Sequence, residues 1–172
     1  MFTLDLKPDN IGLTKEGTMK ILDFGLSTCV KTRQSSKDTY KMTGYTGSLR
    51  YMAPEVALRK SYTERVDVYS FGLILWQMMR DRVPFGTLSK EEIMQLVIQQ
   101  QQQPLRPKMS SYWPRGLCLL LSDCWQVNAI SRPSFAEIVQ RLDQLILLQQ
   151  QRQRRISLSP AWMVTSLRQY FQ

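Results

Sequence analysis

The sequence contains no histidine and only three cysteines, and both shortages limit the chemistry available to its 172 residues. Without histidine there can be no serine–histidine triad and no histidine-bound metal. The cysteines are Cys29, Cys118 and Cys124, and no two of them have the CxxC spacing of a metal site. We interpret them as reduced thiols, which favours an intracellular, cytoplasmic protein.

Long apolar runs are also absent. The most apolar segment, residues 66–79, is interrupted by Asp67, Ser70 and Gln77. A stretch this short and polar does not span a bilayer. The first residues also lack the basic and apolar stretches of a signal peptide. We therefore expect no transmembrane segment.

Positive charge is in excess, and the formal net charge is +9. Lysine and arginine are scattered along the chain, apart from a cluster near the end at Arg152, Arg154 and Arg155. This distribution is typical of a solvated surface with a basic tail rather than of a polyanion-binding site. We therefore expect no nucleic-acid partner.

The residues that are present fit one globular domain, since 43% of them are hydrophobic and 10% aromatic. Apolar residues on either side of a turn at 14–17 predict a small β-hairpin over residues 11–22, with Gly17 supplying a positive φ. Residues 27–48 are polar and aperiodic. They predict a long loop, and a loop of this length in a compact domain is usually functional.

Helical spacing of apolar residues predicts most of the remaining structure. We expect helices over residues 63–80, 90–98, 115–126 and 134–148. The first, with Thr63 as its cap, is apolar nearly all round and should lie buried among the others. The last begins with a capping-box pattern at Ser134. Residues 149–172 are polar and basic, and we expect a disordered tail after a domain of residues 1–148.

The side chains that could carry chemistry stand on both sides of the predicted hairpin. Asp5, Lys7 and Asn10 precede it, and Asp23-Phe24-Gly25 follows it. A hairpin brings its two ends together, so a carboxylate, an ammonium, an amide and a second carboxylate should meet. Such a group suits a divalent cation with oxygen ligands and a phosphate held by the cation and the lysine.

Further motifs follow in a fixed order along the chain. They are Gly47-Ser48, Tyr51-Met52-Ala53-Pro54-Glu55, Asp67-Val68-Tyr69-Ser70-Phe71-Gly72, Cys124-Trp125 and Arg132-Pro133. Together with the residues around the hairpin, they resemble the C-terminal lobe of protein kinases over about residues 3–148. The resemblance is greatest to tyrosine-kinase-like serine/threonine kinases. It implies a mainly α-helical kinase C-lobe with a small β-hairpin and an activation loop.

The resemblance also implies roles for the residues around the hairpin. Asp5 would accept or orient the proton of the substrate hydroxyl, and Lys7 would balance charge on the transferred phosphate. Asn10 and Asp23 would hold magnesium ions that bridge the phosphates of ATP. Mg²⁺ and ATP are therefore the implied cofactors. Lys7, two residues beyond Asp5, is typical of serine/threonine kinases, so a protein substrate or docking partner is implied.

Other matched residues are implied to support this site. Ser48 corresponds to the hydroxyl residue of the substrate-docking loop. Glu55 would pair with Arg132, and Asp67 would hydrogen-bond the catalytic-loop backbone from beneath. The full set implied to be structural is Phe24, Gly25, Glu55, Asp67 and Arg132.

The sequence departs from the kinase pattern at two places. Thr3-Leu4 stands where the family has His-Arg before the aspartate. Thr3 cannot reproduce the histidine's contact with Phe24, and Leu4 cannot bind a phosphate on the activation loop. In addition, no Gly-rich loop, strand lysine or helix-C glutamate precedes Asp5.

These departures leave three hypotheses open. The chain is an incomplete or alternatively started form of a kinase, a short pseudokinase that acts as a protein-interaction module, or an unrelated fold with chance motifs. Because nothing in these 172 residues covers the ATP phosphates, we expect the chain alone to be inactive. We also expect an exposed apolar surface around Leu13 and Phe24. The sequence predicts no oligomeric state.

Overall fold

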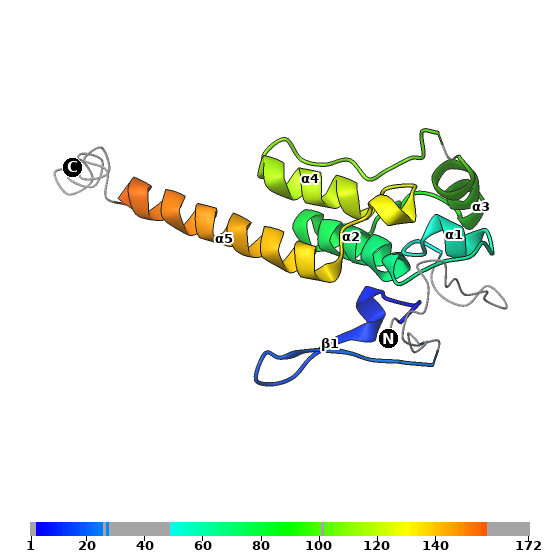
Figure 1. The fold of residues 1–172 in the computed structure, drawn as a ribbon, viewed down its shortest axis with the longest axis horizontal. Coiled ribbons are helices and arrows are strands. Elements are labelled where there is room, and N and C mark those ends of the chain that lie inside the picture. The colour runs from blue at the N-terminus through cyan, green and yellow to red at the C-terminus, as the bar shows by residue number, and fades with distance from the viewer. Residues whose placement is uncertain (1–2, 26, 28–48, 101, 158–172) are drawn as a thin grey trace. The chain divides into compact units, whose positions relative to one another are not determined.

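The described part of the protein is mainly α-helical, with a single two-stranded sheet (Figure 1). This computed structural model describes residues 3–25, 27, 49–100 and 102–157. Of these, residues 155–157 are described by their backbone only. The chain forms two compact units, Met1–Phe135 and Ala136–Gln172. The sequence-based expectation of a mainly α fold with a small hairpin is confirmed.

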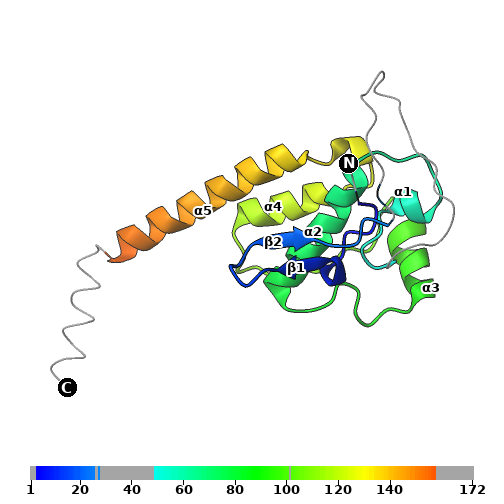
Figure 2. The same ribbon diagram turned by 90° about the horizontal axis from the view of Figure 1, so that it is seen from below.

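The hairpin follows a single 3₁₀ turn, η1, at Pro8–Asn10. Strand β1 is Ile11–Leu13 and strand β2 is Met19–Ile21, and they pair antiparallel with Ile11 opposite Ile21 (Figure 2). Gly17 has φ of 80°, the left-handed conformation that glycine adopts without strain. The hairpin and the role of this glycine match the sequence prediction.

Helix α2, Arg65–Arg80, is the central buried helix of the first unit. The N-cap residue is Glu64 rather than the predicted Thr63, and the Thr63 hydroxyl accepts the Arg65 N–H (3.4 Å) just before it. It ends at Asp81, which has left-handed φ of 53°. The short helix α1, Pro54–Ala57, precedes it.

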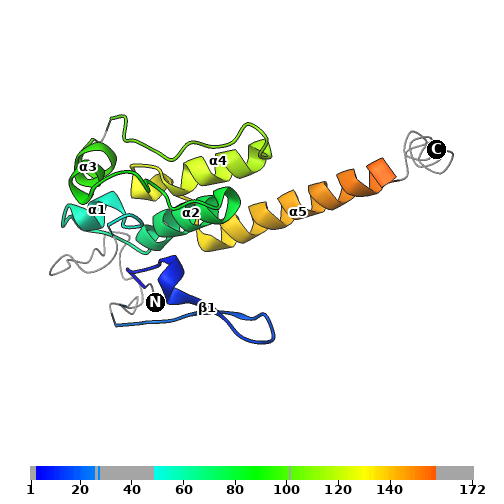
Figure 3. The same cartoon turned by 180° about the vertical axis from the view of Figure 1, so that it is seen from behind.

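Helix α4, Arg115–Cys124, packs against α2 (Figure 3). The helices approach each other closely at Gly72, where an added Cβ would lie 2.7 Å from the Cβ of Cys124. Only a residue without a Cβ allows the two helices to approach this closely. The 3₁₀ helix η3, Ala129–Ser131, follows α4.

The helix predicted over 90–98 has two parts. Helix α3, Lys90–Glu92, begins with a capping box in which Ser89 and Glu92 bond each other's backbone N–H. It continues as the π-helix η2, Ile93–Gln99. Hydrophobic spacing does not distinguish an α-helix from a π-helix over so few residues, so the sequence could not foresee this change.

Helix α5, Phe135–Ser157, has 23 residues and runs beyond Leu148, where the sequence prediction ended it. The added part is rich in glutamine and arginine, which are good helix formers even without an apolar partner. No helix among the described residues is long and apolar enough to cross a membrane.

Candidate functional site

Asp5, Lys7 and Asn10 form a compact polar cluster in the loop before the hairpin, which we call the Asp5 cluster. Lys7 Nζ lies 2.6 Å from Asp5 Oδ2, and Asn10 Nδ2 donates to Asp5 Oδ2 (3.1 Å) and to the Asp5 carbonyl (2.8 Å). Pro8 opens the η1 turn, in which the Asn10 N–H bonds the Lys7 carbonyl (3.0 Å). This turn brings Asn10 back over Asp5.

The Asp5 cluster stabilises the protonated form of Lys7. Its pKa is raised above 10.5, chiefly by the hydrogen bond to Asp5, with further attraction from the carboxylates of Asp9 and Asp23. Partial burial opposes the shift. The ammonium group therefore stays protonated at neutral pH, poised to meet an anionic group.

Asp23 lies at the same end of the hairpin as Asn10. The Leu22 N–H donates to the Asn10 carbonyl (2.8 Å), which ties together the loops on either side of the sheet. Asp23 has left-handed φ of 58°, and its Oδ1 accepts the Gly25 N–H (3.0 Å). The structure thus brings the predicted residues on the two loops to one region.

The donor atoms of this region suit a magnesium ion. Among the described residues, no hydrogen bond engages Asn10 Oδ1 or Asp23 Oδ2. Amide and carboxylate oxygens are the ligands that Mg²⁺ takes, and it usually needs only one or two carboxylates beside phosphates and water. The described residues contain no group of three His, Cys, Asp or Glu side chains that would hold a metal by themselves. A site shared with a phosphate ligand fits both observations.

Asp67 on α2 fixes the start of the loop from beneath. Its Oδ2 accepts the Thr3 N–H (2.7 Å) and its Oδ1 accepts the Leu4 N–H (3.0 Å). Burial raises the pKa of Asp67, and these two N–H groups partly offset the rise. Leu4 has left-handed φ of 62°, so the carboxylate holds the backbone in a conformation that leucine rarely adopts. The sequence predicted this contact.

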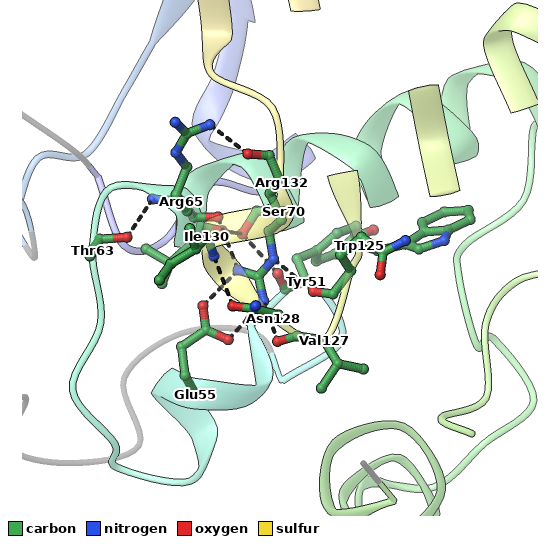
Figure 4. Close-up of polar contacts among 12 residues, drawn as sticks. Tyr51, Glu55, Thr63, Arg65, Ser70, Trp125, Val127, Asn128, Ile130 and Arg132 are labelled. Atoms are coloured by element: carbon green, nitrogen blue, oxygen red, sulfur yellow. Dashed lines mark hydrogen bonds and ion pairs between the residues drawn. The ribbon is translucent and has the colours of Figure 1, made fainter. Parts of the chain in front are cut away.

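Glu55 and Arg132 form a bidentate ion pair, also as predicted (Figure 4). Arg132 Nη1 and Nη2 donate to the two carboxylate oxygens at 2.6 and 2.9 Å. The Arg132 side chain is fully buried. It also bonds the carbonyls of Gln126 (2.9 Å) and Arg65 (3.0 Å), while Arg65 Nη1 donates to the Arg132 carbonyl (2.6 Å).

The side chains around this ion pair were not predicted from the sequence. The ring of Tyr69 lies close to two guanidinium groups, with its centroid 5.1 Å from Cζ of Arg132 and 5.5 Å from Cζ of Arg106. Arg106 also donates two hydrogen bonds to the Trp125 carbonyl. An arginine 26 positions before Arg132 carries no local signal for such contacts, so only the structure could reveal them.

The remaining predicted residues lie on the exposed surface near this site or outside the described residues. Phe24 is 50% exposed and Leu13 is 72% exposed, as expected for an uncovered hairpin surface. A small, partly open pocket at Asp5 is lined by Leu4, Asp5, Leu6, Tyr51, Met52 and Ser70. Ser48 and most of the predicted loop lie outside the described residues.

Comparison with known proteins agrees with the motif order. Residues 2–142 match the model of the protein kinase domain. Serine/threonine-protein kinase VIK of Arabidopsis thaliana is 40% identical over 143 residues, covering 82% of this chain and 32% of that protein. The dual specificity protein kinase shkB of Dictyostelium discoideum is 38% identical over 148 residues, covering 84% of this chain and 22% of that protein.

A third relative is the mitogen-activated protein kinase kinase kinase dlk-1 of Caenorhabditis briggsae. It is 35% identical over 136 residues, covering 79% of this chain and 15% of that protein. The chain thus spans a third or less of the length of these curated relatives.

Proposed function

Because the chain belongs to the protein kinase domain family, we propose that it supplies the catalytic half of a serine/threonine kinase active site. The reaction would move the terminal phosphoryl group of ATP to a hydroxyl group of a protein substrate. The observation that carries the proposal is the Asp5 cluster, which joins a carboxylate, an ammonium and an amide at 2.6–3.1 Å.

Each residue of the cluster has a task that its contacts support. Asp5, held by Lys7 and Asn10, would accept or orient the proton of the substrate hydroxyl. Lys7, whose raised pKa keeps it charged, would offset negative charge on the phosphoryl group. The residues do this by positioning and charge neutralisation, without a covalent intermediate on the protein.

Asn10 and Asp23 would hold Mg²⁺ through Asn10 Oδ1 and Asp23 Oδ2. When bound, the ion would neutralise charge on the phosphates of ATP. The hydrogen bond from the Leu22 N–H to the Asn10 carbonyl (2.8 Å) would help to keep these two side chains near each other. Gly25 fixes the Asp23 carboxylate by donating its N–H to Oδ1 (3.0 Å).

By themselves, these 172 residues would not catalyse phosphoryl transfer. Their sequence holds no G-x-G-x-x-G loop to cover the phosphates. Productive binding of ATP would therefore require another protein segment with those features, in the same polypeptide or in a second one.

A second candidate function is that of a protein-interaction module. The substitution of His-Arg by Thr3-Leu4 and the exposed apolar side chains of the hairpin favour it. Leu13 and Met19 are 72% and 59% exposed, which is unusual for a monomeric surface. For such a module, the charges of Asp5 and Asp23 would not matter.

Phosphoryl transfer by a completed chain separates the two functions. The N-terminal kinase segment of a relative such as VIK would be fused ahead of Thr3, and transfer from labelled ATP to a mixed protein substrate would be measured. We expect transfer that falls at least about 10³-fold in Asp5→Asn and in Asp23→Asn, with thermal stability unchanged. If the folded fusion without these substitutions transferred no more phosphate than its Asp5→Asn variant, the interaction module would be favoured instead.

A further inference from the structure

Helix α5 carries exposed apolar side chains that the proposed kinase function does not use. Val139 and Ile146 are 56% and 54% exposed, and Leu142 between them is half-buried. These residues follow the 3–4 spacing of a coiled-coil heptad. The same spacing continues through Gln149, Gln153 and Ile156. We call these six positions the α5 seam.

From this seam we propose that α5 pairs with the α5 of a second copy of the chain as a parallel, in-register coiled coil. With Val139 at position a, the a positions hold Val139, Ile146 and Gln153, and the d positions hold Leu142, Gln149 and Ile156. β-Branched residues at a with leucine at d favour two parallel strands. A second copy of α5 supplies such a parallel strand.

The charges of the helix fit this partner. None of the six seam positions is charged, although the helix also carries Glu137, Arg141, Asp143 and several later arginines. Of the residues that flank the seam, Asp143 lies at e and Arg152 at g. By position in a parallel pair, Arg152 is matched with Ser157 of the other copy and Asp143 with Ile138, which is buried within its own chain, so no like charges are opposed.

The two glutamines decide the orientation. In a parallel, in-register pair, Gln149 lies opposite Gln149 and Gln153 opposite Gln153, so each amide meets an amide that can bond it. In an antiparallel pair aligned over the same seam, Gln149 would lie against Ile146 and Gln153 against Leu142, and neither apolar side chain can bond an amide. A buried amide without a partner is destabilising, so the parallel arrangement is favoured.

Sedimentation equilibrium of the full chain tests the pairing. The mass should rise from 20.1 kDa toward twice that value over a ~100-fold range of concentration. Ile146→Asp on the seam should weaken association at least about tenfold. Gln144→Asp, an exposed position on the far side of the helix, should leave it unchanged. A chain that stays at 20.1 kDa, or equal effects of both variants, would overturn the proposal.

Two further variants test the register and the location. Gln149→Cys should form a disulfide-linked dimer under mild oxidation, well above the level of Gln151→Cys or of the wild type. Equal crosslinking at the two positions would overturn the parallel register. Replacing both seam glutamines, by Gln149→Leu and Gln153→Ile, should tighten association about tenfold. If Leu13→Lys in the hairpin weakened association and Ile146→Asp did not, the assignment to α5 would be overturned.

Discussion

Arg132 and Glu55 stand 77 positions apart in the chain, and their side chains meet in a bidentate ion pair at 2.6 and 2.9 Å. The pair joins the segment after α4 to helix α1. Because Arg132 also bonds the backbone at Gln126 and Arg65, one guanidinium links three parts of the first unit. The stability of this unit should depend strongly on it.

The first prediction concerns the loss of this arginine. Arg132→Met should lower the free energy of unfolding by about 3–5 kcal/mol, because it strands a poorly solvated Glu55 carboxylate. Arg132→Lys should recover little, since lysine cannot bond both oxygens. Equilibrium unfolding in urea measures the effect. Arg80→Met at the exposed end of α2 is the control, and a loss no larger than in the control would contradict the prediction.

The second prediction concerns the carboxylate beneath the catalytic loop. Asp67→Asn keeps one acceptor oxygen but turns an NH₂ group toward Thr3 or Leu4, whose N–H groups both need acceptors. We expect a destabilisation of about 1–3 kcal/mol at pH 7. Asp81→Asn, at an exposed position, is the matched control. Hydrogen exchange should be faster at the amides of Thr3 and Leu4, and unchanged exchange there would argue against the contact.

The third prediction is a pH dependence of the same carboxylate. Burial raises the pKa of Asp67 above 3.8 in the folded state, so the folded protein holds this proton more tightly than the unfolded chain does. Asp67 therefore contributes stability that is complete below pH 3.8 and is lost as the pH rises through the raised pKa. The wild type should gain stability relative to Asp67→Asn as the pH is lowered from 7 toward 4. The opposite trend in paired urea titrations would refute this.

The fourth prediction concerns the approach of α2 and α4. Gly72→Ala would place a Cβ 2.7 Å from the Cβ of Cys124 and should destabilise the protein by about 1–3 kcal/mol. Gly12→Ala is the control, since its Cβ meets only the flexible end of Leu22 at 3.3 Å. Adding Cys124→Gly should recover part of the loss. Full stability of Gly72→Ala in thermal unfolding would mean that the helices can separate at little cost.

The sequence predicted the parts of the structure that depend on local patterns and on recognised motifs. The hairpin followed from apolar residues around Gly17, and the pairing of Glu55 with Arg132 followed from the family motif. The contacts of Tyr69 with Arg106 and Arg132 arise from residues far apart in the chain, and no sequence pattern predicts them. The continuation of α5 beyond Leu148 was missed because polar helix formers resemble a tail when apolar periodicity is the guide.

Calorimetric titration of Mg²⁺-ATP into the 172-residue chain tests most directly whether it holds the catalytic half of a kinase site without the ATP-clamping half. We predict no saturable binding at micromolar concentrations, because nothing in the sequence covers the phosphates. The VIK-completed chain, titrated beside it, should bind and should lose that binding with Asp23→Asn. Clear micromolar affinity in the 172-residue chain alone would contradict this account.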